Sequence, residues 1–273
     1  MILRTAIALA IILAGAMGSY AGSGTVPARD ARFEDPYVGE AQFAELPARA
    51  SRPSALILAA AQGAAAPPQT PSASSQGRRA ADAPGDFEFF LLSLSWSPSY
   101  CAAQGAARDA RQCRSARPFA FIVHGLWPQK SGSYPDFCQT PPPFVPEETI
   151  TAMGDIMPSK GLILHEWRKH GTCTGLSPEA YFALVRAAFA KVAIPEAFAA
   201  PRAPLSMTAQ AVEEAFRAAN PALGGDMIAV DCQSDRLREV RICLSKDLAF
   251  TPCPQVDRRG CALRRVLEIP APQ

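Results

Sequence analysis

The chain has 273 residues, with 27 Lys or Arg, 25 Asp or Glu, and a formal net charge of +2. Residues 86–273 are also close to neutral, with 20 basic and 19 acidic side chains. They carry no Lys/Arg-rich run or Arg–aromatic repeat. This composition argues against a tight nucleic-acid-binding protein. It is compatible with an enzyme that holds a few phosphates only transiently.

The N-terminus has the sequence pattern of an export signal. Arg4 precedes an apolar run from Thr5 to Met17, and small residues around Ala21 follow it, which predicts a signal peptide over 1–21. The run is short for a membrane span, and no other stretch reaches the roughly eighteen apolar residues that a span needs. We therefore expect a protein exported to the periplasm or the cell exterior without stable membrane association. An uncleaved anchor is the alternative.

Residues 22–85 are rich in Ala, Pro, Ser and Gly and show no sustained period of 2 or 3.6. Such a segment cannot bury much of a core, so it predicts a disordered linker or a propeptide. The remaining residues, 86–273, are numerous enough for a single domain with a core of its own.

Two strands are predicted at the start of this domain. Residues 87–96 are apolar on both faces, as in a central strand. A second strand is predicted over 117–124 and should end where Gly125 and Pro128 force a turn. This would place His124 at a strand end.

The later elements complete a mixed pattern. Ser177 and Pro178 predict the start of a helix over about 178–192, and a second helix should run from Thr208 to the Asn220-Pro221 stop. Paired strands are expected at 226–232 and 237–244, with a last strand at 265–269. Because strands and helices do not alternate regularly, we predict an α+β fold with a central antiparallel sheet and helices packed on it.

The chain has only three histidines, and all lie in two short blocks. The first block, FIVHGLWPQ over 121–129, holds His124, and the second, HEWRKHGTC over 165–173, holds His165 and His170. Histidine is the side chain that titrates near neutral pH, so this concentration indicates acid–base chemistry.

The second block has helical spacing. In a helix, His165, Glu166, Lys169 and His170 would share an arc of about 140°, and Trp167 would point away from it toward a core. The two histidines are five residues apart, whereas a zinc-binding His-Glu-x-x-His helix needs a spacing of four. A zinc site on this helix alone is therefore not expected.

Each of these residues also has an ordinary interpretation. A single histidine such as His124 in an apolar strand is more often structural, Glu166 beside Lys169 is more often a solvated helix face, and Trp127 is more often part of a core. The occurrence of both blocks together, in order, favours the functional interpretation.

The chain contains eight cysteines, none in a C-x-x-C pair. An even number in an exported protein predicts disulfides rather than a zinc ribbon or redox site. Cys173, the last residue of the second block, is more readily explained as structural than as a nucleophile beside His170.

The two blocks contain the segments HGLWP and HEWRKHGTC, which resemble the signature segments of the ribonuclease T2 family of secreted acid ribonucleases. FEFFLLSLSWSPSYC over 87–101 resembles the family's first strand and first cysteine. LREVRICLSKDLAFTPCP over 237–254 resembles its late strand and C-terminal cysteine region. The resemblance covers about residues 86–270.

The resemblance implies an endoribonuclease that cleaves single-stranded RNA through a 2′,3′-cyclic phosphate, later hydrolysed to a 3′-phosphate. Such cleavage needs a base for the ribose 2′-OH, an acid for the leaving 5′ oxygen, and donors around the phosphorane. No cofactor or metal is implied, DNA should not be cut because it lacks the 2′-OH, and a monomer is expected. The implied catalytic residues are His124, Glu166 and His170, and the implied substrate-binding residues are His165, Lys169 and Trp127.

Several features stay open at this point. The sequence does not decide which of His124 and His170 is the acid and which the base. Trp127 is the expected stacking partner for a base. Gln129 occupies a position where many relatives have an acidic or amide side chain, and the register of Tyr134 is not fixed, so low base specificity is expected.

The resemblance also implies a disulfide pairing: Cys101–Cys113, Cys138–Cys173, Cys232–Cys261 and Cys243–Cys253. Two other classes of function remain as alternatives. One is a catalytically silent relative that binds or inhibits. The other is a metal-dependent hydrolase with His124, His165 and His170 as ligands, which excess EDTA would silence.

Overall fold

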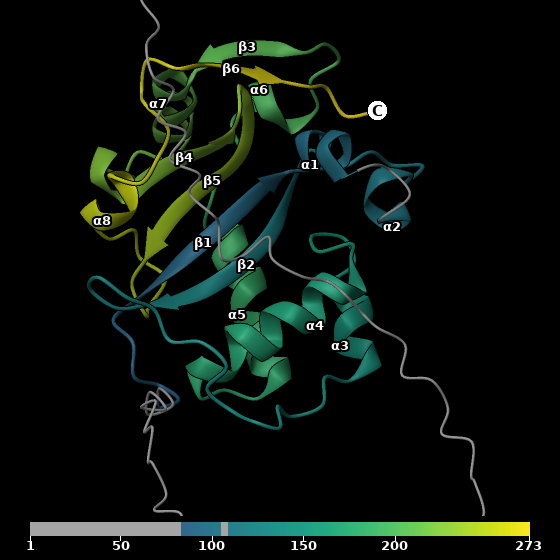
Figure 1. The fold of residues 1–273 in the computed structure, drawn as a ribbon, viewed down its shortest axis with the longest axis vertical. Helices are drawn as coiled ribbons and strands as arrows, with labels where there is room; N and C mark the ends of the chain where they lie inside the picture. Colours follow the sequence, from purple (N-terminus) through teal and green to yellow (C-terminus); the bar gives the residue numbers. More distant parts are fainter. Residues whose placement is uncertain (1–82, 105–108) are drawn as a thin grey trace, which may run out of the picture. The chain divides into compact units, whose positions relative to one another are not determined.

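The computed structural model describes residues 83–104 and 109–273 (Figure 1). The predicted signal peptide over 1–21 and the predicted linker over 22–85, except for its last three residues, lie outside the described residues, so both stay predictions. The backbone N–H of Gly85 donates to the carbonyl of Cys173 at 2.8 Å. Contacts of the domain therefore begin just before residue 86.

A six-stranded sheet lies at the centre of the described part of the chain (Figure 1). Its order is β2-β1-β5-β6-β3, and β4 pairs with β5 off this path. Four pairings are antiparallel, and β5 meets β6 in parallel at a single residue pair. The α+β prediction is confirmed, and the sheet is mixed rather than wholly antiparallel. The strands are β1 (Phe89–Trp96), β2 (Phe121–Gln129), β3 (Leu205–Thr208), β4 (Ile228–Gln233), β5 (Arg236–Leu244) and β6 (Val266–Ile269).

Both predicted helices form, with the predicted capping. The Ser177 hydroxyl accepts from the backbone N–H of Ala180, and the Thr208 hydroxyl accepts from that of Ala211. Asn220 follows the end of the second of these helices. The helices are α1 (Ser97–Gln104), α2 (Ala110–Cys113), α3 (Glu147–Ala152), α4 (Lys160–Lys169), α5 (Pro178–Ala190), α6 (Glu196–Ala199), α7 (Ala209–Ala219) and α8 (Pro254–Asp257), with 3-10 turns η1 (Gly171–Thr174) and η2 (Gly225–Met227).

The two faces of the sheet are covered differently. On one face, alternate residues of β1 such as Leu92 and Leu94 pack with Tyr181 and Phe182 of α5 and Phe216 of α7 in the main core. The opposite face carries a smaller apolar cluster and a group of charged side chains. Successive side chains of a strand point to opposite faces of the sheet, so each strand contributes to both environments. The smaller cluster consists of Phe89, Leu91, Trp127, Ala229, Cys243, Cys253 and Val256.

The predicted boundaries of the second strand were wrong. Strand β2 continues through Gly125 and Pro128, which the sequence had suggested as a turn. It lies at the edge of the sheet, where a proline without an N–H is tolerated. Gly125 pairs with Ser93 and Val123 with Leu94, so His124 is the additional residue of a β-bulge in the middle of the strand.

Four disulfides join the eight cysteines, with the pairing that the resemblance implied: Cys101–Cys113, Cys138–Cys173, Cys232–Cys261 and Cys243–Cys253. Cys138–Cys173 ties the loop after β2 to η1, at the end of the second histidine block. Within residues 83–104 and 109–273, no helix has the length and apolar character needed to cross a membrane.

Candidate active site

The bulge in β2 determines which side chains share a face. His124 and Gly125 both point to the side of Trp127, because the extra residue interrupts the regular alternation. The ring centroids of His124 and Trp127 are 5.3 Å apart in an edge-to-face arrangement. A Cβ at position 125 would overlap Nε1 of Trp127 and the carboxylate of Glu166, so this close approach requires glycine.

The second block contributes the end of α4 and the turn that follows. Ser159 caps the start of α4, and His170 is the residue at its end, with φ −116° and ψ −45°. Trp167 is buried and its Nε1–H donates to the carbonyl of Pro143 at 2.8 Å, away from Glu166. The predicted helical arc and its core anchor are therefore present, although η1 replaces the helix after His170.

Glu166 connects the two blocks. Nε1–H of Trp127 donates to Oε2 of Glu166 at 2.6 Å, and Oε1 of Glu166 lies 3.8 Å from Nε2 of His124. The residue is 1% exposed. Burial raises the pKa of Glu166 to about 7, and the charge of His124 and the Trp127 hydrogen bond only partly offset it. This carboxyl group therefore changes protonation near neutral pH.

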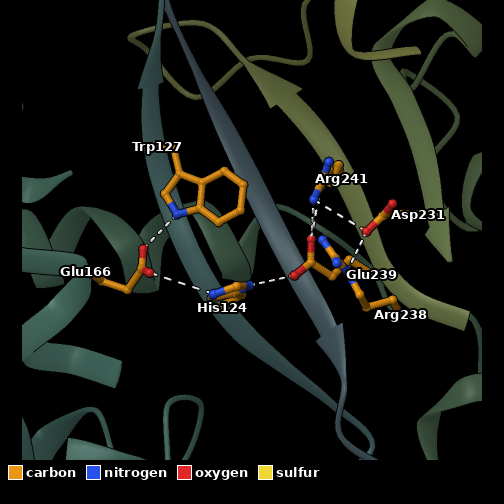
Figure 2. Close-up of polar contacts among 7 residues, drawn as sticks. All are labelled: His124, Trp127, Glu166, Asp231, Arg238, Glu239 and Arg241. Carbon is orange, nitrogen blue, oxygen red and sulfur yellow. Dashed lines mark hydrogen bonds and ion pairs between the residues drawn. The ribbon is translucent and has the colours of Figure 1, made fainter. Parts of the chain in front are cut away.

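A second carboxylate, Glu239 of β5, holds the other side of the imidazole. Its Oε1 lies 2.6 Å from Nδ1 of His124. Nε of Arg241 donates to Oε2 of Glu239 at 2.9 Å, and Nη2 of Arg241 lies 3.4 Å from Oδ2 of Asp231. Figure 2 shows the resulting chain of contacts, which runs from Glu166 through His124 to Glu239 and its arginine.

Glu239 is not among the site residues predicted from the sequence. It lies 115 residues from His124 in the chain, so no local spacing connects them. The signal that was available is an acidic residue inside a strand with buried apolar residues, Leu237 and Val240, around it. Buried carboxylates need a partner, so such a residue indicates an ion pair without saying with which group.

The pKa shifts of the three histidines differ in direction. Burial lowers the pKa of His124, but Glu239 and then Glu166 outweigh burial, so the net pKa is raised. Burial and the charge of Lys169 hold the pKa of His170 well below its ordinary value. Burial and then the charge of Lys169 also lower the pKa of His165, to about 4. Arg241 and His124 together outweigh burial and hold the pKa of Glu239 well below the usual range.

Three of the predicted site residues, His124, Glu166 and His170, contact a fourth, Trp127. The ring centroids of Trp127 and His170 are 5.3 Å apart, and the rings are inclined at 31°. His170 is fully buried and Lys169 is 5% exposed, whereas His165 is partly exposed. In the described ranges, no group of three or more His, Cys, Asp or Glu side chains is arranged to hold a metal ion.

Comparison with known proteins identifies the family of the chain. The sequence model of the Ribonuclease T2 family matches residues 87–253. Since this is more than half of the chain, the protein belongs to the ribonuclease T2 family.

Individual relatives cover different shares of the chain. A ribonuclease of Aeromonas hydrophila is 43% identical over 95 residues, which are 34% of this chain and 40% of that protein. Ribonuclease DdI of Dictyostelium discoideum is 28% identical over 198 residues, 66% of this chain and 83% of that protein. The matches to the Aeromonas protein and to a probable ribonuclease of Haemophilus influenzae span less than half of those relatives, 40% and 44%.

Solved structures show the same fold. Trichomaglin, described as an S-like ribonuclease, superposes with a TM-score of 0.54 at 24% identity, covering 68% of this chain and 100% of that one. RNase NT in complex with 5′-AMP superposes with a TM-score of 0.52 at 24% identity, covering 68% of this chain and 99% of that one.

Proposed function

We propose that the protein is an exported endoribonuclease that cleaves single-stranded RNA by metal-free acid–base transphosphorylation. The observation that carries the proposal is the convergence of His124, Glu166 and His170 around Trp127 from two distant segments. Two imidazoles and a carboxyl group at one place supply the acid, the base and a hydrogen-bonding group that this reaction needs.

In the proposed first step, His170 takes the proton from the ribose 2′-OH and His124 gives a proton to the leaving 5′ oxygen. The opposite pKa directions support this assignment, since His124 favours the charged form and His170 the neutral form. The new bond joins the 2′ oxygen to phosphorus, and the bond from phosphorus to the 5′ oxygen breaks. The product is a 2′,3′-cyclic phosphate.

The remaining site residues have supporting roles in the proposal. Glu166, in its neutral form below about pH 7, can donate a hydrogen bond to a phosphorane oxygen beside Nε2 of His124. Lys169 and His165 hold phosphate oxygens, and the Trp127 ring, which is 2% exposed, stacks on a base once substrate binding uncovers it. His170 is fully buried, so substrate binding must include movement of a covering side chain; Trp127 is the neighbouring ring.

Export, a monomeric state, low base specificity and lack of DNA cleavage are further parts of the proposal. Four disulfides support an oxidising compartment. A mechanism in which the ribose 2′-OH is the nucleophile supports discrimination against DNA.

The test is RNA cleavage across pH in excess EDTA, with mass spectrometry of the products from a dinucleotide. We expect a bell-shaped profile, because one histidine must be charged and the other neutral, and a cyclic phosphate as first product. Loss of cleavage in EDTA would favour the metal-dependent hydrolase, and direct formation of a 5′-phosphate would exclude the mechanism. An inactive folded protein would favour the silent relative.

A further inference from the structure

The carboxylate of Glu239 is built into the sheet beside His124. Its side chain is 3% exposed, and β5, from which it projects, pairs with β1 on one side and β4 on the other. A buried carboxylate is costly unless it is paired and hydrogen-bonded. Glu239 uses one oxygen for Nδ1 of His124 and the other for the guanidinium of Arg241.

The surrounding charges hold this carboxylate in place. Nη2 of Arg241 lies 2.8 Å from Oε2 of Glu239, and Oδ2 of Asp231 lies 2.6 Å from Nε of Arg238. Arg238 is the additional residue of a second β-bulge, since Asp231 pairs with Glu239 and Cys232 with Leu237. The two carboxylates and two guanidinium groups balance in charge, so the network can be buried without excess charge.

The position of the hydrogen bond fixes the function of each ring nitrogen. Nδ1 is engaged by Glu239, while Nε2 lies 3.8 Å from the nearest oxygen of Glu166, beyond hydrogen-bond distance. The His124 side chain is 25% exposed. Nε2 is therefore the nitrogen that can transfer a proton to a substrate oxygen.

We propose that Glu239 is a positioning residue for the reaction of this site: it keeps the proton on Nδ1 of His124, directs Nε2 toward the substrate, and stabilises the imidazolium form. This inference rests on the proposed function. When the Nε2 proton passes to the leaving oxygen, the neutral ring retains its Nδ1–H and its bond to Glu239. The ring therefore does not need to reorient between turnovers.

The pH dependence follows from the groups that face His124. Glu239 and Arg241 face it from β5, and Glu166, His165 and His170 face it from α4 and its end. Glu239 and Glu166 raise the pKa of His124, and Arg241 lowers it. Removing the charge of Glu239 should therefore lower the pKa of His124 and move the loss of activity at high pH to a lower pH.

The test is Glu239→Gln, which keeps the size and an acceptor oxygen but removes the charge. With a dinucleotide substrate we expect kcat at neutral pH to fall about 10- to 100-fold and KM to change less than about threefold. The basic limb of the profile should move down by about one pH unit. In ¹⁵N NMR, easily assigned because the chain has three histidines, the His124 pKa should fall by a similar amount.

Glu213→Gln is the matched control. Glu213 is also a buried glutamate, and its Oε1 accepts from the backbone N–H of Val230 on the neighbouring strand β4, outside the site. The activity, pH profile and His124 titration of the Glu213→Gln variant should equal those of the unmodified protein. Glu239→Asp, which keeps the charge, should recover part of the His124 pKa and provides the test if Glu239→Gln does not fold.

An unchanged His124 titration and pH profile in folded Glu239→Gln would overturn the positioning role, as would an equal loss in Glu213→Gln. The NMR titration does not depend on turnover. If the unmodified protein cut no RNA but its His124 titration still depended on Glu239, the proposed function would fail and the contact would stand.

Discussion

The two histidines beside Trp127 lie in contrasting surroundings. Both ring centroids are 5.3 Å from that of Trp127. His124, on the sheet, is partly exposed and faces the carboxylates of Glu239 and Glu166. His170, at the end of α4, is fully buried, and burial and then the cation of Lys169 lower its pKa. Burial and neighbouring charges therefore determine the protonation state of each ring, and one side chain type provides both an acid and a base.

Removal of either imidazole should have the largest effect. His124→Ala and His170→Ala should each lower kcat with RNA by about 10²- to 10⁴-fold, because each removes one proton transfer. His165→Ala should mainly raise KM, by about tenfold, because it removes a phosphate contact. Steady-state kinetics with a dinucleotide measures both kcat and KM. Near-normal rates for His124→Ala or His170→Ala would refute the assignment of these residues as the acid and the base.

Gly125→Ala should disturb the surroundings of both His124 and His170 at once. The added Cβ would overlap Glu166 and Trp127, so the carboxyl group and the indole must separate. We expect about 10- to 100-fold lower kcat and a loss of about 1–3 kcal/mol in the free energy of unfolding. Gly161→Ala, where the added atom would lie at an ordinary 3.8 Å from the Ser159 hydroxyl, is the control and should be near neutral in activity and urea unfolding.

Trp127→Phe should separate the stacking ring from the indole N–H. The phenyl ring retains a face for a base, but Glu166 loses the hydrogen bond that lowers its pKa. We therefore expect the Glu166 pKa to rise above about 7. Because the carboxyl group is no longer held beside Nε2 of His124, kcat should fall about tenfold while KM changes little. The pH profile is the measurement; a large KM increase with unchanged kcat would assign Trp127 to binding alone.

Glu213→Gln should leave the two histidines unaffected and change only stability. Burial raises the pKa of Glu213 to about 7, so its stabilising contribution is present below its unfolded pKa near 4.5 and is lost as pH rises through about 7. Melting temperatures should match at pH 4.5, and by pH 8 the variant should melt about 2–4 °C higher. A parallel pH dependence in both proteins would contradict this assignment.

The fold was predictable where local signals dominate. The caps at Ser177 and Thr208 located α5 and α7, and uniform apolar character located β1. The end of β2 was not predictable, because Gly125 and Pro128 are turn residues in most contexts and only the edge position of the strand accommodates Pro128. The parallel β5–β6 contact depends on tertiary packing and has no local signal.

The candidate site, too, was predictable only where the signals are local. Helical spacing in the second block correctly separated Glu166 and His170 from Trp167, because that geometry is local. Glu239 was missed because its partner is far away in the chain, and a sequence pattern cannot say which buried cation a buried carboxylate meets. The burial of His170 was also missed, since it depends on how the end of α4 packs beside β2.

The β2 bulge makes the site sensitive to chain length as well as to residue type. Over the paired segment, β2 has one residue more than β1 needs, and that surplus residue is His124. Deleting Val123 would restore regular pairing by placing His124 opposite Leu94, on the face of the main core. Substitutions in this strand can be conservative, but this loss of one residue cannot, because it would turn the imidazole away from the carboxylates of Glu166 and Glu239.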